Sequence, residues 1–202
     1  MLTKFDTVPG RGGVVAGDDI DTDRIIPASF MKTVTFDGLG EFAFYDERFD
    51  EQGNSKNHPL DAPEHKGASV LITGRNFGSG SSREHAPQAL YRFGLRAIIA
   101  ENFAEIFFSN STKLGIPCVS LPTEELAELT AWAKANPAED IEIDLPKKEI
   151  RAGGKTWTFI QQESAREALM KGEYDPLSFL LANREKIAAT AKNIPYRAWA
   201  KS

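Results

Sequence analysis

The sequence predicts a mixed α/β fold whose core is a parallel βαβαβ unit. Three apolar runs have the length and composition of buried strands, namely 68–73, 97–100 and 117–121. Two segments with helical periodicity separate these runs, namely 83–93 and 103–113. Gly94 and Gly115 stand directly after the helical segments, where a left-handed residue commonly ends a helix. Because open α/β sheets bind ligands beyond the C-terminal ends of their strands, the segment after the first strand is the first candidate for a site.

Length and composition indicate one globular domain spanning residues 1–202. With 202 residues, of which 41% are hydrophobic and 26% charged, the chain can bury one core of ordinary size. A net charge of -5 argues against a nucleic-acid surface. Residues 1–13 lack the apolar segment of a signal peptide, and no run approaches the roughly 18 apolar residues of a membrane span. We therefore expect a cytoplasmic protein without a nucleic-acid or membrane partner.

Outside this core, other segments also have regular patterns. They are a short apolar run at 13–20, helical periodicity at 123–135, and strand alternation at 141–145 and 155–160. The two alternating segments predict a C-terminal β-hairpin with one exposed face. Residues 163–202 predict a helical C-terminal extension, in which Ser164 to Glu167 has the pattern of a capping box.

Residues 35–65 are less regular, and two interpretations stay open. Phe42 and Phe44, near the start of this segment, can pack on the domain. The tip at 52–58 has the polar composition of an exposed turn. The segment is therefore either a mobile lid over the site or a surface loop without function.

The chain contains a single cysteine, Cys118. One thiol excludes an internal disulfide, and an iron-sulfur cluster needs several thiolates. The sequence around Cys118 is that of a buried strand, so we expect an inert core thiol. His58, His65 and His85 do not have ligand spacing. We expect no metal bound by this chain alone.

The segment from Gly74 to His85 follows the first core strand and holds three glycines, three serines and two arginines. It lacks the third glycine of a dinucleotide fingerprint and the Gly-Lys-Ser/Thr end of a P-loop. Backbone N–H groups of such a loop at a helix N-terminus still suit an anion. A carboxylate or a free phosphate is the favoured ligand.

A structural interpretation of Ser81 competes with this one, because Ser81 and Glu84 have the spacing of a capping box. Pro87 argues against it. A helix capped by Ser81 would place Pro87 in its sixth position, where proline removes a hydrogen bond. A start nearer Arg83 places Pro87 in the first turn and leaves the hydroxyl of Ser81 free.

An acidic segment, Asp21 to Asp23, lies near the N-terminus. Its residue types favour an Asx-type turn, and it offers too few oxygen ligands for a hard cation. On the same grounds Lys32 is an ordinary surface charge.

Three motifs together carry a resemblance to a known family. They are Asp21-Thr22-Asp23-Arg24-Ile25-Ile26-Pro27, Asn76-Phe77-Gly78-Ser79-Gly80-Ser81-Ser82-Arg83-Glu84-His85-Ala86 and Glu101-Asn102-Phe103. In these motifs the chain resembles the swivelling domain of the aconitase superfamily, a β/β/α fold, and most of all the family of 3-isopropylmalate dehydratase small subunits. The resemblance covers nearly the whole chain, whose length is similar to that of the longer bacterial form.

The resemblance implies a hydro-lyase of leucine biosynthesis that interconverts 2-isopropylmalate and 3-isopropylmalate and is inactive without a large subunit. The [4Fe-4S] cluster is then expected on that large subunit of a heterodimer, with no cofactor on this chain. Ser81 would be the catalytic base and Arg83 would bind a substrate carboxylate. The implied substrate-binding residues are Ser82, Lys32, Thr33, Asp21, Asp23 and Asn76, of which Lys32 stands where shorter relatives often have arginine.

Other functions remain open on the sequence. A related hydro-lyase would act on homoaconitate, citraconate or 2,3-dimethylmalate, because the segment that selects the substrate is short. A stand-alone phosphate or nucleotide-binding module would use the same glycine-rich loop. An interaction subunit that only shapes its partner would use Ser81 as a structural cap.

Overall fold

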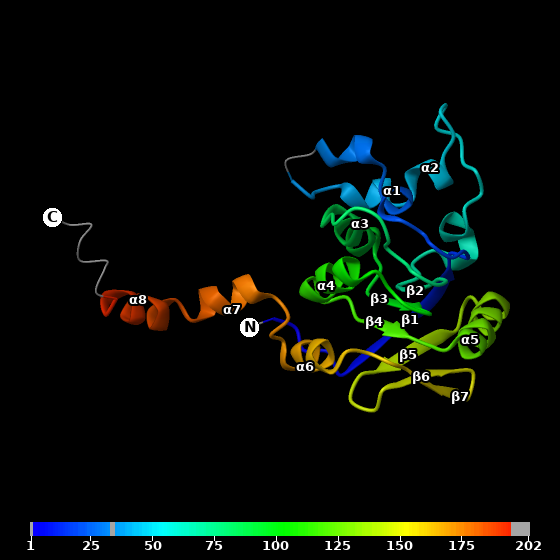
Figure 1. Ribbon diagram of the computed structural model, residues 1–202. Coiled ribbons are helices and arrows are strands. Elements are labelled where there is room, and N and C mark those ends of the chain that lie inside the picture. The colour runs from blue at the N-terminus through cyan, green and yellow to red at the C-terminus, as the bar shows by residue number, and fades with distance from the viewer. Residues whose placement is uncertain (1, 33–34, 195–202) are drawn as a thin grey trace.

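The computed structural model describes residues 2–32 and 35–194, and its centre is one mixed sheet (Figure 1). The seven strands have the order β4-β3-β2-β1-β5-β6-β7. Their bounds are β1 Thr7–Val14, β2 Val70–Ile72, β3 Ala97–Ala100, β4 Cys118–Ser120, β5 Asp140–Asp144, β6 Glu149–Ala152 and β7 Lys155–Thr158. The α/β fold class expected from the sequence is confirmed.

Strands β1 to β4 run parallel and form one half of the sheet. The predicted βαβαβ unit is present within it, with α3 (His85–Phe93) between β2 and β3 and α4 (Glu105–Lys113) between β3 and β4. The structure adds β1, which pairs with β2 and which the sequence did not indicate. The parallel part therefore has one strand more than predicted.

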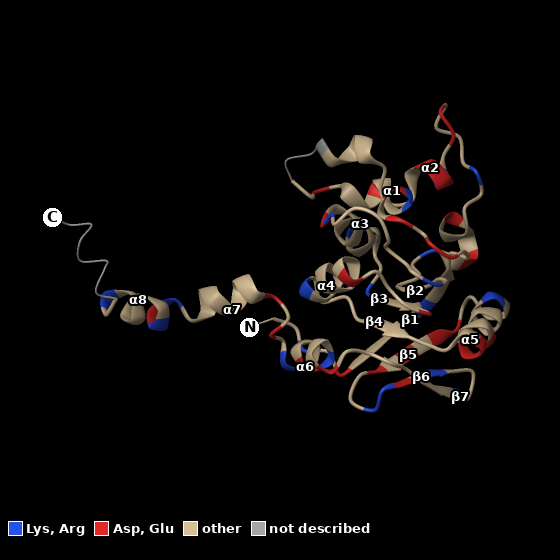
Figure 2. Ribbon diagram, viewed as in Figure 1, with Lys and Arg blue, Asp and Glu red and all other residues tan. Residues whose placement is uncertain are grey.

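The core strands are buried on both faces, and their residues alternate between two apolar clusters. Val70 and Ile72 belong to one cluster, and Leu71 belongs to the other. The first cluster contains Leu129 of α5 (Thr123–Ala135), and the second contains Leu90 of α3. Helices α3 and α4 thus cover one face of the sheet, while α5 covers the opposite face. Glutamates occupy the first turn of α5 and a lysine its last turn, as the helix dipole favours (Figure 2).

Strand β1 also pairs antiparallel with β5, and β5, β6 and β7 continue as an antiparallel meander. The two-residue turn at Gly153 and Gly154, both with positive φ, joins β6 to β7. The predicted hairpin of 141–145 with 155–160 is wrong in its pairing, because β6 lies between these segments. A C-terminal hairpin exists, but its strands are β6 and β7.

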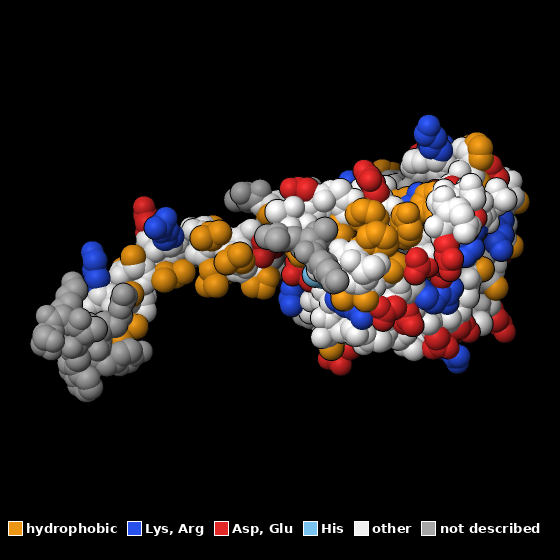
Figure 3. All heavy atoms as spheres, turned by 90° about the horizontal axis from the view of Figure 1, so that it is seen from above, with side chains coloured by type: hydrophobic (Ala, Val, Ile, Leu, Met, Phe, Trp, Pro, Cys, Tyr) orange, Lys and Arg blue, Asp and Glu red, His pale blue; other side chains and the backbone are white. Residues whose placement is uncertain are grey.

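Up to residue 194, where the described part of the chain ends, three helices follow the meander, namely α6 (Glu163–Lys171), α7 (Pro176–Ala182) and α8 (Arg184–Lys192). Helix α6 packs Leu169 into the core, and Ser164 is not its cap, because the helix already begins at Glu163. Helices α7 and α8 have no buried residue and reach away from the sheet. Apolar side chains lie exposed along them (Figure 3), including Leu177, Phe179, Leu180, Leu181 and Ile187.

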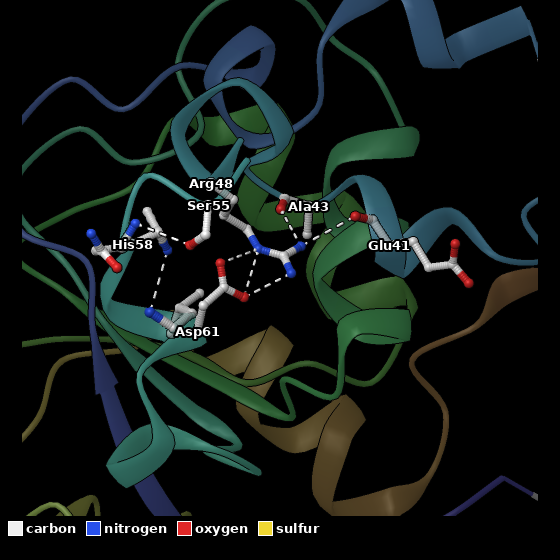
Figure 4. Close-up of polar contacts among 8 residues, drawn as sticks. Glu41, Ala43, Arg48, Ser55, His58 and Asp61 are labelled. Carbon is white, nitrogen blue, oxygen red and sulfur yellow. Dashed lines mark hydrogen bonds and ion pairs between the residues drawn. The ribbon is translucent and has the colours of Figure 1, made fainter. Parts of the chain in front are cut away.

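Residues 15–69 connect β1 to β2. Apart from residues 33 and 34, which the structure does not describe, this connection contains two short helices, α1 (Thr22–Ile25) and α2 (Tyr45–Arg48), and four 3-10 turns, Ala28–Lys32, Leu39–Phe42, Pro59–Asp61 and Pro63–His65. Phe44 is fully buried in this connection. The guanidinium of Arg48 donates to the Asp61 carboxylate and to the carbonyls of Glu41 and Ala43 (Figure 4). Arg48 therefore ties together the start and the end of the 41–61 stretch.

Candidate active site

Three loops meet where the parallel strands end. The loop after β2 carries the glycine-rich motif and lies between the loops that follow β1 and β3. On one side, Gly78 N donates to Ile20 O at 2.8 Å, and Thr22 N donates to Ser79 O at 2.8 Å. On the other side, Phe77 N donates to Asn102 O at 3.2 Å. The three sequence motifs thus form one surface, held by backbone hydrogen bonds.

Glycine at position 78 is required by this arrangement. Its φ is +79°, in the region that side chains disfavour, and a Cβ there would lie 2.1 Å from Cγ of Phe107. Phe107 is buried in the core and stacks edge-on against Phe77 at 5.2 Å. The loop can therefore lie directly on α4.

The helix after the loop begins at His85, so Pro87 lies in the first turn, as predicted. Glu84 occupies the cap position and makes no side-chain cap hydrogen bond. Ser81 is not the N-cap of this helix, and its exposed hydroxyl is not used by the helix. The capping-box interpretation of Ser81 is wrong.

The hydroxyl of Ser81 contacts Arg83, which in turn pairs with Asp23. Arg83 Nη2 donates to Ser81 Oγ at 3.1 Å. The same guanidinium donates to both carboxylate oxygens of Asp23, through Nη1 at 2.6 Å and Nη2 at 3.0 Å. The Arg83 side chain is only 13% exposed, whereas that of Asp23 is 54% exposed. The structure thus brings together three of the predicted site residues.

The other predicted site residues on these loops have different contacts. Asp21 caps α1, accepting from Arg24 N at 2.8 Å, which is the Asx-type contact expected from the sequence. Asn76 has a positive φ and donates from its side chain to Asp19 Oδ1 at 2.8 Å. Ser82 is exposed and has no side-chain hydrogen bond within residues 2–32 and 35–194. None of the three joins the Ser81–Arg83–Asp23 group.

Lys32 ends a 3-10 turn, Ala28–Lys32, and Thr33 lies outside the described residues. Phe36, which follows these two residues in the chain, approaches α3, the helix after the motif loop. The ring of Phe36 packs edge-on against the ring of His85, with centroids 5.2 Å apart. His85 is the first residue of α3 and lies two positions after Arg83.

One residue of the site was not singled out from the sequence. Thr22 lies between the two motif aspartates, is 1% exposed, and bonds through its hydroxyl to the backbone of Ser81. These residues are 59 positions apart. Local spacing gives no signal for such a contact, since only the fold brings α1 against the motif loop.

The described residues contain no group of three or more histidine, cysteine, aspartate or glutamate side chains close enough to hold a metal ion. Cys118 is 1% exposed, and burial raises the pKa of its thiol to about 12 against a weaker lowering by a hydrogen bond with Ser111. A thiol in that state is a poor metal ligand. No helix in the described ranges is long and apolar enough to span a bilayer.

The family model of the aconitase C-terminal domain matches residues 3–124, a range that includes the three loops. A 3-isopropylmalate dehydratase small subunit of Thermus thermophilus is 52% identical over 97% of this chain and 98% of its own length. That of Synechocystis is 43% identical over 98% of both chains. A crystal structure of 3-isopropylmalate dehydratase from Methanocaldococcus jannaschii, 30% identical, superposes with a TM-score of 0.64 over 89% of this chain and 99% of its own.

The chain therefore belongs to the family of 3-isopropylmalate dehydratase small subunits. This finding confirms the resemblance drawn from the three motifs. Enzymes of the aconitase family use a [4Fe-4S] cluster.

Proposed function

We propose that this chain is the small subunit of a 3-isopropylmalate dehydratase and supplies one half of its active site. The enzyme interconverts 2-isopropylmalate and 3-isopropylmalate by loss and readdition of water. Small subunits of that name are 52% and 43% identical to this chain over nearly its full length, which supports the activity and a large-subunit partner. The substrate is a small dicarboxylic acid, and we place the complex in the cytoplasm, as expected for leucine biosynthesis.

Ser81 is the base that removes the carbon-bound proton. The observation that carries this role is the hydrogen bond from Arg83 Nη2 to Ser81 Oγ at 3.1 Å. A serine hydroxyl is a weak base, so Ser81 must act as its alkoxide. The alkoxide is stabilised only if a positive charge and a hydrogen-bond donor lie beside it. The guanidinium supplies both in a partly buried position, where such interactions are stronger than in water.

Arg83 also binds one carboxylate of the substrate. Two of its nitrogens are engaged by Asp23, while its Nε–H group has no hydrogen-bond partner among the residues the structure describes. Asp23 holds the plane of the guanidinium, which leaves Nε–H, on the same edge as Nη2, for a substrate carboxylate. Ser82, exposed beside Ser81, contributes a hydroxyl to the same carboxylate.

The segment around Lys32 selects the substrate, and Lys32 and Thr33 contact it. The support for this placement is the packing of Phe36 on His85, which brings the end of that segment to the start of α3. Asp21 and Asn76 border the bound substrate. In the free chain their side chains bond Arg24 N and Asp19, so they also shape the loops that carry the site.

The cluster belongs to the large subunit. One buried thiol with a pKa raised to about 12 does not fit a cluster that needs several thiolates. When bound in the partner, the cluster supplies Lewis-acid chemistry at the substrate hydroxyl. The residues of this chain act at the neighbouring carbon, where Ser81 takes the proton, and Arg83 fixes a carboxylate of the substrate.

Reconstitution tests the proposal. The chain alone is expected to be inactive, and adding the cluster-bearing large subunit is expected to give turnover of 2-isopropylmalate and 3-isopropylmalate. Ser81→Ala should lower kcat by about 10³-fold, because a general base of this kind contributes roughly 10²- to 10⁴-fold. Ser164→Ala, which removes an exposed hydroxyl on α6 outside the three loops of the site, is the matched control.

Two results would contradict the proposal. One is full turnover by Ser81→Ala in a complex that assembles normally by size-exclusion chromatography. The other is a reconstituted enzyme that converts homoaconitate, citraconate or 2,3-dimethylmalate in preference to 3-isopropylmalate, which would assign the chain to a different hydro-lyase.

A further inference from the structure

The hydroxyl of Thr22 exchanges two hydrogen bonds with the backbone of Ser81. Ser81 N donates to Thr22 Oγ1 at 3.1 Å, and Thr22 Oγ1 donates to Ser81 O at 3.2 Å. Thr22 is 1% exposed, so water does not compete for the hydroxyl. One buried side chain thus engages both polar backbone groups of the proposed base.

The residue before Ser81 is adapted to this contact. Gly80 has a φ of +93°, and a Cβ added there would lie 3.3 Å from Thr22 Oγ1, closer than to any other atom outside its chain neighbours. A side chain at position 80 would crowd the hydroxyl that holds Ser81. Gly80 therefore lets the loop backbone approach Thr22.

Thr22 is the first residue of the short helix α1, which is held in place by hydrogen bonds to other segments. Asp21 caps the turn through Arg24 N at 2.8 Å. Arg24 Nε donates to Glu47 at 2.5 Å, and Phe44 N donates to Ile25 O at 2.8 Å. These contacts anchor α1 to the 41–61 stretch, so the hydroxyl of Thr22 is presented from a rigid support.

Both hydrogen bonds of the Thr22 side chain are made with Ser81. The backbone of the motif loop is separately attached at Ser79, whose carbonyl accepts from Thr22 N at 2.8 Å. Replacing the Thr22 side chain leaves that backbone hydrogen bond in place. The loop would stay docked at Ser79, while Ser81 would lose both hydrogen bonds to Thr22 and keep at its carbonyl only the local one from Arg83 N at 2.8 Å.

We infer that Thr22 is a positioning residue whose hydroxyl holds Ser81 Oγ in place beside Arg83. This inference rests on the proposed role of Ser81 as the base. The Oγ–Nη2 contact of 3.1 Å depends on where the backbone of Ser81 lies. A displacement of about 1 Å at a reacting group costs roughly 10²-fold in rate.

The test compares Thr22→Val with Thr22→Ser in the reconstituted two-subunit enzyme. Valine has the shape of threonine without the hydroxyl, and serine keeps the hydroxyl. We expect Thr22→Val to lower kcat by about 10²-fold with KM for 3-isopropylmalate unchanged, since Thr22 does not touch substrate. Thr22→Ser should retain most of the wild-type kcat, because it preserves both hydrogen bonds.

A second measurement needs no variant. The amide hydrogen of Ser81 in the wild-type chain should exchange with solvent more slowly than that of the exposed Ser82. Equal, rapid exchange of the two amides would overturn the inference even if Thr22→Val failed to fold.

The kinetic outcomes separate this inference from the proposed function. Wild-type kcat in Thr22→Val, or an equal loss in Thr22→Ser, overturns the positioning role while Ser81→Ala stays inactive. If Ser81→Ala is itself active, the proposed function fails, and the positioning inference fails with it.

Discussion

Arg83 and Asp23 form a two-point ion pair across two loops that are 60 residues apart in sequence, with Nη1 to Oδ1 at 2.6 Å and Nη2 to Oδ2 at 3.0 Å. Two parallel hydrogen bonds fix the plane of a guanidinium as well as its position. The plane matters here because the same Nη2 donates to Ser81 Oγ. Asp23 therefore orients the donor that acts on the proposed base.

Asp23→Asn should lower kcat of the reconstituted enzyme by about 10- to 100-fold, because an amide accepts only one of the two hydrogen bonds and leaves Arg83 free to rotate. Steady-state kinetics with 3-isopropylmalate provides the measurement. Asp46→Asn is the control, since this exposed carboxylate has no side-chain hydrogen bond or ion pair within the described ranges. Unchanged kcat in Asp23→Asn would show that Arg83 is held by other groups.

Gly78→Ala should lower the free energy of unfolding by about 2–5 kcal/mol, from a strained positive φ together with overpacking against Phe107. Denaturant titration of the isolated chain measures this loss. Gly53→Ala measures the cost of the positive φ without overpacking, because Gly53 has a φ of +81° and no atom lies within 4 Å of a Cβ there. A loss no larger than that of Gly53→Ala would mean that α4 moves away at little cost.

His58 should make stability fall as the pH drops below its ordinary pKa. Burial lowers the pKa of His58 below 6.5, against the opposing effect of the Glu47 and Asp61 carboxylates and with a further lowering by Arg48. Near pH 6 the unfolded chain therefore binds more protons at this residue than the folded chain, and the free energy of unfolding decreases with falling pH. Unfolding free energies between pH 7.5 and 5.5 measure the effect.

The matched variant for this test is His58→Asn. The ring Nδ1 accepts from Leu60 N at 3.3 Å, and an asparagine oxygen can make the same contact without titrating. The pH dependence of unfolding should become flatter in this variant. An unaltered slope would place the titration in other groups.

Removal of residues 175–202 should leave the folded core nearly as stable as before, because α7 and α8 bury no residue. Thermal unfolding of the shortened chain checks this expectation. Removal of residues 163–202 is the comparison, and it should cost at least about 3 kcal/mol, since α6 carries the fully buried Leu169. A large loss from the first truncation would mean that the extension is part of the cooperative unit.

The core of the fold was predictable because its strands and helices carry their own local signals. The segment 97–100 was predicted to the residue, since its four apolar residues are buried in alternating directions and glycine ends the preceding helix. The helix at α3 begins two residues later than predicted, at His85. From the position of Pro87, the sequence correctly predicted that this helix begins too late for Ser81 to be its N-cap.

Strand β1 was missed because its sequence, with Pro9 and three glycines, resembles a loop. Its glycines are explained by tertiary packing: a Cβ on Gly12 would lie 2.9 Å from Ile141, and one on Gly13 would lie 2.7 Å from Leu60. Strand β6 was missed because it has only four residues, two of them charged. In both strands the neighbours that make the segment extended are distant in sequence.

The site was predicted in part for the same reason. Ser81 and Arg83 lie two residues apart in one motif, and their contact is local. The contacts of Ser81 with Thr22 and of Arg83 with Asp23 join residues about 60 apart, which a single sequence does not encode by spacing.

Strand β1 pairs on one edge with β2, up to Ile72, and on the other edge with β5, where Thr7 is opposite Asp144. On the ribosome, the first of these edges can close once Ile72 has emerged, whereas the second stays open for about 70 further residues. An open strand edge invites association between nascent chains. Pro9, which lacks an amide hydrogen, and the glycines beside it make this edge a poor template for a wrong partner while the correct one is still being translated.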